Sequence, residues 1–393
     1  MRSAGGPWLL RTATGTYAVA VAPDEAGLVL QDWTDGEPRA WQPEDVHGFR
    51  LPVDRQPLEY AALGSRHAGG VDLVVDHGGG LVGARLVWRS DDVRLAETAT
   101  GSILTATTRD TTGDLGLTLI IEVSREHDVV TKSVSITNTG RAVLTLPRAF
   151  GPAWELPVGP GARVDYLYGD WSREFTPGRV ELPAGELSLG SRQGITSHDY
   201  APTVRVSAPD DPDGPAYGVA LAWSGSWRLL VEAPPFGARV RVAGGVDDES
   251  GVITLEPGER FTTPTTLGVR APDGADGVRA RWHDYQRGWL ARDLGPAHRP
   301  IVYNSWYATT FAVDVDSQRA LADVAAGLGV EVFVVDDGWF RGRTSDRAGL
   351  GDWQPDPAKF PDGLAPLARA VVERGMRFGI WVEPEAVNPD SDL

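Results

Sequence analysis

Short segments in which apolar and polar residues alternate run from the start of the chain to about residue 270. Three of them are Leu117–Val123, Thr131–Ile136 and Arg228–Glu232, and Gly, Pro, Asp and Asn residues separate such segments. Alternation with a period of two is typical of strands that bury one face of a sheet. No helical period of useful length precedes residue 276, and no internal repeat suggests a propeller. We therefore predict a large antiparallel β-sandwich over residues 1–275.

The pattern changes near Pro272. Apolar side chains recur at helical spacing between residues 276 and 292, and Gly295-Pro296 provides a stop signal. Residues 276–295 are therefore predicted to form a helical linker.

Beyond the linker, short apolar strands alternate with helical segments. The predicted strands cover residues 301–306, 332–335 and 378–382, and the predicted helices cover residues 317–327 and 363–374. This alternation is typical of a parallel sheet with right-handed crossovers. The predicted fold class is multidomain β plus α/β, in which residues 296–393 form strands 1–3 of a partial (β/α)8 barrel. A barrel needs eight strands, so the chain is either a truncated fragment, which we prefer, or it carries three βα units as a small appendage.

The segment 332–340 points most directly to a function. Its four apolar residues predict a fully buried strand, and Asp336, Asp337, a glycine and two aromatics follow them. Ligands bind at the carboxyl ends of parallel strands, and the other two strands end near Trp306 and Trp381. Carboxylates accept paired hydrogen bonds from vicinal hydroxyls, and an indole face covers the apolar side of a pyranose. We therefore predict a sugar or polyol site on this rim, although Asp-Asp-Gly alone is also a common turn.

The composition limits the classes of binding partner and the location that we expect for this chain. A formal net charge of −17 disfavours nucleic acid or an anionic membrane and fits an uncharged ligand. No cysteine is present and the seven histidines lack a ligand-like spacing, so we predict neither a metal nor a cofactor. The apolar run near the start is too short for a signal peptide and no stretch is long enough to span a membrane, so a cytoplasmic location is expected. Only two lysines occur, Lys132 and Lys359, so arginine carries almost all the positive charge, which we interpret as a habit of coding composition without chemical meaning.

A series of short motifs follows in a specific order along the chain. The motifs of the first part are Tyr168-Gly169-Asp170-Trp171, Ser191 to His198, Trp223-Ser224-Gly225-Ser226-Trp227 and Leu255 to Glu259. Those of the second part are Asn304-Ser305-Trp306, Val334 to Phe340, Gly351-Asp352-Trp353, Lys359 to Leu364 and Gly379 to Glu385. Each motif alone is weak, but their order is specific. The chain resembles the bacterial α-galactosidases of glycoside hydrolase family 36.

The resemblance implies a β-supersandwich followed by a (β/α)8 barrel. It also implies retaining hydrolysis of terminal α-D-galactosyl residues of oligosaccharides such as melibiose and raffinose. It assigns Asp336 and Asp337 to galactose hydroxyls, and it places Trp306 and Trp381 in the galactose pocket. A loop with Trp171 is expected to reach the active site of a neighbouring subunit, so the full-length protein is expected to be a homotetramer.

The same resemblance predicts two catalytic carboxylates that residues 1–393 do not contain. A retaining glycosidase needs one carboxylate as nucleophile and a second as general acid/base. In the family the nucleophile lies in a Lys-Trp-Asp-x-Asn segment after the fourth barrel strand, and the acid/base comes later; neither segment occurs in residues 1–393. We therefore expect no catalytic residue in this chain, both catalytic carboxylates beyond Leu393, and no activity of the 393 residues alone.

Two other functions stay open. One is a galactosyl transferase of the raffinose-synthase type with the same pocket, and the other is a non-catalytic galactoside-binding or assembly protein. Tyr307, Thr310 and Ala312 depart from the family pattern, so the exact substrate stays open. An α-N-acetylgalactosaminide also stays open as substrate, because the residues that contact the 2-position are expected beyond Leu393. Glu383 and Glu385 either orient other groups or belong to a solvated loop.

Overall fold

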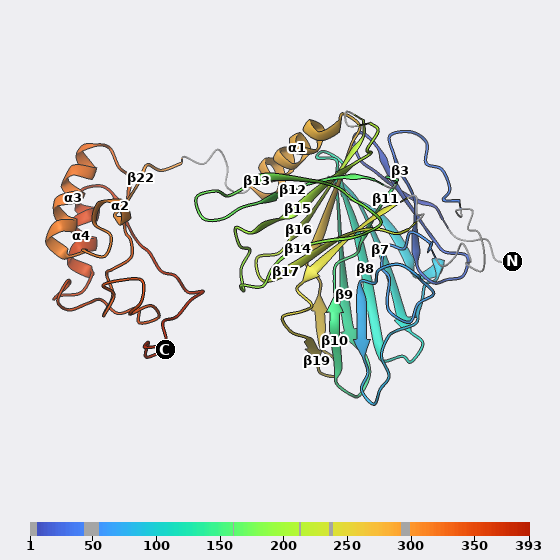
Figure 1. The fold of residues 1–393 in the computed structure, drawn as a ribbon, viewed down its shortest axis with the longest axis horizontal. Helices are drawn as coiled ribbons and strands as arrows, with labels where there is room; N and C mark the ends of the chain where they lie inside the picture. Colours follow the sequence, from blue (N-terminus) through green and yellow to red (C-terminus); the bar gives the residue numbers. More distant parts are fainter. Residues whose placement is uncertain (1–5, 43–54, 160, 212–213, 236–238, 292–298) are drawn as a thin grey trace. The chain divides into compact units, whose positions relative to one another are not determined.

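The computed structural model describes residues 6–42, 55–159, 161–211, 214–235, 239–291 and 299–393 (Figure 1). The chain divides into two compact units, Met1–Asp293 and Leu294–Leu393. Unit 1 is built mostly of β-strands, whereas unit 2 combines strands with helices. Among the described residues no helix has both the length and the apolar character needed to cross a bilayer.

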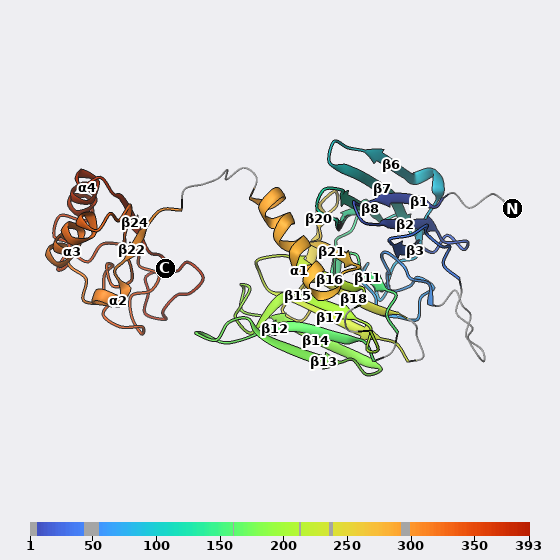
Figure 2. The same cartoon turned by 90° about the horizontal axis from the view of Figure 1, so that it is seen from above.

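The strands in the described part of unit 1 form four antiparallel sheets (Figures 1 and 2). The largest has eleven strands, in the order β13 (Thr176–Glu181), β12 (Arg163–Tyr168), β15 (Tyr200–Ser207), β16 (Ala216–Ala222), β21 (Thr265–Ala271), β9 (Val129–Asn138), β8 (Leu115–Ser124), β7 (Gly101–Asp110) and β5 (Leu86–Val87), with β20 (Arg260–Thr262) paired to β9 and β6 (Val93–Glu97) paired to β7. A four-stranded sheet has the order β11 (Trp154–Leu156), β18 (Val240–Val246), β17 (Trp227–Ala233) and β14 (Gly185–Ser191). The two three-stranded sheets are β1 (Trp8–Arg11), β2 (Thr16–Val21) and β3 (Leu28–Thr34), and β19 (Ile253–Leu255), β10 (Leu144–Ala149) and β4 (Leu73–Asp76). A short 3-10 turn, η2 (Ser90–Asp92), precedes β6.

One hydrophobic core is shared by all four sheets. Tyr17 of β2, Leu73 of β4, Leu119 of β8 and Trp227 of β17 are all buried in it. Along β8, buried and half-buried residues alternate as the sequence pattern predicts, because successive side chains of a strand point to opposite faces. Each fully buried leucine contributes roughly 1.5–3 kcal/mol through the hydrophobic effect, so this shared core stabilises the β-rich part of the chain.

Lys132 lies inside this core. Its ammonium donates hydrogen bonds to Glu59 Oε2 at 2.5 Å and to the carbonyl of Ala153 at 3.0 Å, and it lies 3.9 Å from the centre of the Trp154 ring. Tyr17 donates to the other oxygen of Glu59 at 2.6 Å. Burial lowers the pKa of Lys132, and the neighbouring Glu59 carboxylate opposes that effect. Lys132 is therefore one half of a buried ion pair.

The helix predicted after the sandwich belongs to unit 1. It begins as α1 (Gly274–Tyr285) and continues as one π-helical turn, η3 (Gln286–Leu290). Val278 and Tyr285 are buried against the large sheet, where they meet Ala271 and Val269 of β21. The last predicted linker residues, 292–295, and the stop signal Gly295-Pro296 lie outside the described residues.

Unit 2 contains a parallel three-stranded sheet in the order β22, β23, β24. Its elements in chain order are β22 (Val302–Asn304), α2 (Trp306–Thr309), α3 (Val315–Gly327), β23 (Val332–Val335), α4 (Ala365–Glu373) and β24 (Arg377–Ile380). Asp314 caps α3 by accepting hydrogen bonds from the backbone N–H groups of Asp316 and Ser317. The two longer helices, α3 and α4, lie side by side in both views (Figures 1 and 2).

The core of unit 2 lies between this sheet and the two helices. Phe333 and Val335 of β23 are fully buried, together with Leu367 and Val371 of α4. The other two residues of the strand, Val332 and Val334, are only half-buried. The expectation of a fully buried strand is therefore wrong for one of its faces.

Candidate functional site

The carboxyl ends of the three parallel strands of unit 2 surround a pocket of about 410 Å³. Because β22 pairs with β23 and β23 with β24 in parallel register, the residues that follow each strand meet at one edge of the sheet. The residues that line the pocket are Asn304, Trp306, Tyr307, Asp336, Asp337, Arg343, Asp346, Trp381 and Glu383. Four of the five side chains proposed from the sequence are thus brought together.

Asp336 is held at the end of β23 with part of its carboxylate free. Its backbone N–H donates to Ser305 Oγ at 2.9 Å, and its two oxygens accept from the Asn304 amide and from the backbone N–H of Asp337. A carboxylate offers about four acceptor positions, so these contacts leave room for hydroxyl donors of a ligand. The side chain is 9% exposed, which orients it firmly while it still lines the pocket.

Asp337 is paired with an arginine that the sequence reasoning missed. Arg343 donates through Nε to Oδ1 at 2.8 Å and through Nη2 to Oδ2 at 2.7 Å. The backbone N–H of Gly338 donates to Oδ1 at 2.7 Å, so most acceptor positions of Asp337 are occupied. Both side chains are buried, and the hydrogen bonds to Asp337 raise the pKa of Arg343. Two parallel N–H donors on one carboxylate form a strong and directional pair, which fixes Asp337 in the pocket wall.

Two half-buried indoles form the apolar part of the pocket. The ring of Trp306 packs edge-on against Phe311, with ring centres 5.1 Å apart. Trp381 packs edge-on against Trp353 at 6.2 Å, and its backbone carbonyl accepts a hydrogen bond from the Trp339 indole at 2.9 Å. Each indole is therefore held by a neighbouring ring while it lines the pocket.

The rim of the pocket is polar and partly open. Tyr307, which departs from the family pattern, is 95% exposed at this rim. Glu383 lines the pocket whereas Glu385 does not. The sequence alone did not distinguish these two residues. Burial, followed by the nearby Glu385 carboxylate, raises the pKa of Glu383. Within the described ranges no cluster of three His, Cys, Asp or Glu side chains is placed to hold a metal ion.

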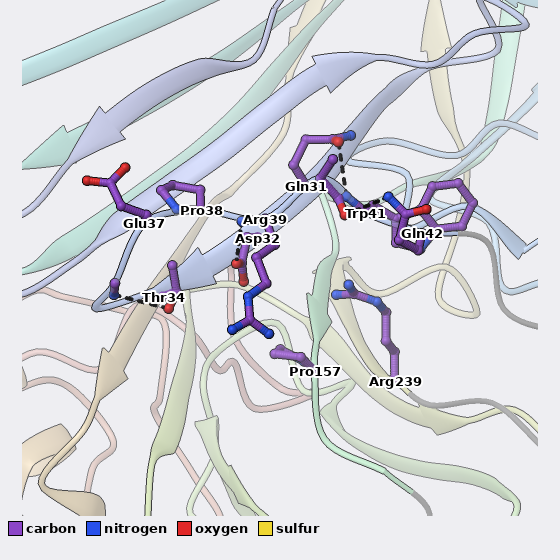
Figure 3. Close-up of a pocket in the computed structure, with 12 residues that line it drawn as sticks. Gln31, Asp32, Thr34, Glu37, Pro38, Arg39, Trp41, Gln42, Pro157 and Arg239 are labelled. Carbon is purple, nitrogen blue, oxygen red and sulfur yellow. Dashed lines mark hydrogen bonds between the residues drawn. The ribbon is translucent and has the colours of Figure 1, made fainter.

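A larger pocket of about 890 Å³ lies in unit 1, beside the segment that follows β3 (Figure 3). Its polar side chains mainly hold their own loop. Asp32 accepts from the backbone N–H of Arg39 at 2.9 Å, and Gln31 accepts from that of Trp41 at 3.1 Å. The smaller pocket of unit 2 has buried carboxylates and indoles at strand ends, so it is the better candidate for a binding site.

Comparison with known proteins identifies the family of this chain. Residues 25–256 match the glycosyl hydrolase family 36 N-terminal domain, and residues 260–393 match the Melibiase family. The chain belongs to glycosyl hydrolase family 36.

The known proteins that this chain matches are longer than the chain. A probable α-galactosidase G of Emericella nidulans is 38% identical over 72% of this chain and 40% of its own length. An α-galactosidase of Escherichia coli is 40% identical over 61% of this chain and 34% of its own length. A structure of a variant of the family 36 α-galactosidase AgaA from Geobacillus stearothermophilus in complex with stachyose aligns with a TM-score of 0.88 and 28% identity, over 98% of this chain and 57% of that chain. The chain thus spans less than two thirds of the length of each of these proteins.

The fifth residue proposed for the family 36 site lies in unit 1. Trp171 follows β12 in an exposed turn, where its backbone N–H donates to Asp170 Oδ1 at 2.8 Å. Its side chain is 74% exposed, and it is not among the residues that line the pocket of unit 2. Its assignment to a neighbouring active site stays a prediction.

Proposed function

We propose that this chain carries the galactose-binding part of a retaining α-galactosidase, which hydrolyses terminal α-D-galactosyl residues of oligosaccharides such as melibiose and raffinose. The observation that carries the proposal is the pocket at the ends of β22, β23 and β24, where a carboxylate with free acceptor positions faces two indoles. Membership of family 36 and the names of the relatives support it.

The roles follow from what each side chain offers. Asp336 accepts hydrogen bonds from galactose hydroxyls, since its carboxylate keeps acceptor positions beyond those used by Asn304 and Asp337. Asp337 shapes the wall through its pair with Arg343 and contributes its remaining acceptor capacity to the sugar. Trp306 and Trp381 cover the apolar C–H faces of the pyranose. Binding of this kind needs neither a metal nor a cofactor.

We further propose that the two catalytic carboxylates are supplied by residues beyond Leu393. Retaining hydrolysis uses a nucleophile and an acid/base about 5–5.5 Å apart on either side of the scissile bond. Asp336 and Asp337 are neighbours in sequence, and the side chain of each accepts a hydrogen bond from the backbone N–H of the next residue. Such an arrangement suits sugar binding rather than the separate roles of nucleophile and acid/base. In this proposal residues 296–393 are strands 1–3 of a (β/α)8 barrel.

For the full-length protein we propose a cytoplasmic homotetramer in which Trp171 reaches the active site of a neighbouring subunit. An indole that is 74% exposed on a turn is well suited to an intersubunit contact. Light scattering of the full-length protein is expected to give a tetramer, and Trp171→Ala is expected to weaken it. A fully active monomer would exclude this arrangement.

The function is tested on the full-length protein with melibiose and raffinose, and with the matching β-galactoside and α-glucoside as controls. Hydrolysis of the α-galactosides with retention of the anomeric configuration, followed by NMR, is the expected result. Preferential transfer of galactose to a sugar acceptor would favour the transferase. Binding of galactosides without any turnover would favour the non-catalytic alternative.

A further inference from the structure

Lys359 is not one of the residues that line the pocket, but its ammonium contacts the loops that carry them. Nζ donates to the backbone carbonyls of Phe311 at 3.1 Å, Gly338 at 2.6 Å and Arg343 at 2.9 Å. An ammonium has three N–H donors and no acceptor, so all three donors are used. One side chain therefore joins the segment after α2, the segment after Asp337, and Arg343 itself.

These carbonyls converge because the loops touch. Gly338 adopts a φ of 92°, and a Cβ atom there would lie 2.8 Å from the Cα of Phe311. The backbone of the Asp337 loop thus packs directly on the backbone of the Trp306 loop. The three carbonyl oxygens carry like partial charges and point toward the same position. A hydrogen-bond donor at that position is therefore required to keep the three carbonyls together.

The rest of Lys359 is fixed on both sides. Its backbone N–H donates to the carbonyl of Asp356 at 3.1 Å, and its own carbonyl accepts from the N–H of Val315, the first residue of α3, at 3.1 Å. The next residue, Phe360, is buried in the core of unit 2. Burial lowers the pKa of Lys359, while the Asp356 and Asp337 carboxylates oppose that change. The ammonium is thus held at the junction from a well-anchored turn.

We propose that Lys359 is a positioning residue for the galactose pocket, because it fixes the loops that present Trp306 and Asp337 and acts on Asp337 through Arg343. The inference rests on the proposed function and adds a residue that never touches the sugar. Arginine cannot replace it fully, since a planar guanidinium directs its donors in one plane and cannot serve three carbonyls around a point.

The test replaces Lys359 by cysteine and then restores an ammonium chemically. Residues 1–393 contain no cysteine, so within them 2-bromoethylamine alkylates only the thiol introduced by Lys359→Cys and gives a side chain of nearly lysine length. Two properties of the full-length protein are measured for Lys359→Cys before and after alkylation. The first is the Kd for D-galactose well below the melting temperature, and the second is the hydrogen-exchange protection of residues 336–343. The unaltered protein is treated with the same reagent in parallel.

We expect Lys359→Cys to raise the Kd for galactose by roughly ten- to a hundredfold and to lose protection over residues 336–343, with both recovered after alkylation. Arg374→Cys removes a cation from an exposed pair with Asp323 in the same unit and is expected to change neither property. An unchanged Kd for Lys359→Cys would overturn the inference while leaving the proposed function intact. If the unaltered protein binds no galactose, the proposed function fails, and the exchange data alone then decide whether Lys359 orders these loops.

Discussion

The pair formed by Asp337 and Arg343 allows a quantitative test of how the pocket wall is held. Arg343→Met keeps the length of the side chain and removes every donor that Arg343 supplies to Asp337. The Asp337 side chain, which is 6% exposed, then keeps the Gly338 N–H as a backbone donor. Breaking a buried ion pair by removing one partner costs about 3–5 kcal/mol, and the remaining donor and the bordering pocket favour the lower end. We expect a loss of about 3 kcal/mol.

Native-state hydrogen exchange at β23 (Val332–Val335) reads this loss directly, because the strand leads into Asp337. A loss of about 3 kcal/mol corresponds to exchange roughly a hundredfold faster. Adding Asp337→Leu to Arg343→Met removes the unpaired charge and is expected to recover part of the loss. Arg374→Met serves as the control, since its pair with Asp323 is exposed and exposed ion pairs contribute little to stability. If Arg343→Met costs no more than this control, the reasoning that Asp337 depends on a desolvated partner is refuted.

Three further predictions concern other residues. Asp336→Asn should lower kcat/KM of the full-length protein for α-galactosides by roughly ten- to a hundredfold, because a charged acceptor of sugar hydroxyls is lost; steady-state kinetics check this, and an unchanged value would remove Asp336 from the site. Lys132→Met should destabilise unit 1 by about 3 kcal/mol or more, because Glu59 is left buried and unpaired; urea denaturation measures this, and Lys132→Met with Glu59→Gln should lose less. Burial raises the pKa of Glu155 to about 8, so the folded state keeps a proton that the unfolded chain loses above its ordinary pKa near 4.5. Stability should therefore fall as pH rises from about 4.5 to 8, by at most about 1.4 kcal/mol per pH unit. In pH-dependent melting, Glu155→Gln should remove that slope.

Local patterns predicted the elements of unit 2 well. The strands at 332–335 and 378–382 correspond to β23 and β24, and the helix at 317–327 corresponds to α3, with differences of one or two residues. These elements were accessible because periodicity and turn residues are local signals. The sequence could predict that Asp336 and Trp381 share one pocket, because parallel strands place their carboxyl ends on one edge of the sheet.

Arg343 could not be found in the same way. It lies in an irregular loop with glycines, where no period tells which way a side chain points, and its role depends on a return of the chain toward Asp337. Lys132 is different, because a signal was present. It shares one face of β9 with Val134 and Ile136, and all three are buried, so strict use of the alternation would have placed it inside the sandwich.

The two lysines of these 393 residues give the protein an unusual property toward amine chemistry. Lys132 is sealed in the core of unit 1, and all three N–H groups of Lys359 are bound to carbonyls in unit 2. Reagents that acylate lysine should therefore find little to modify among the described residues of the native chain. Lys132 becomes reactive only when unit 1 opens, and Lys359 becomes reactive when its three hydrogen bonds break. The rate of acylation at each position, read by mass spectrometry, therefore records local opening in each unit separately within one molecule.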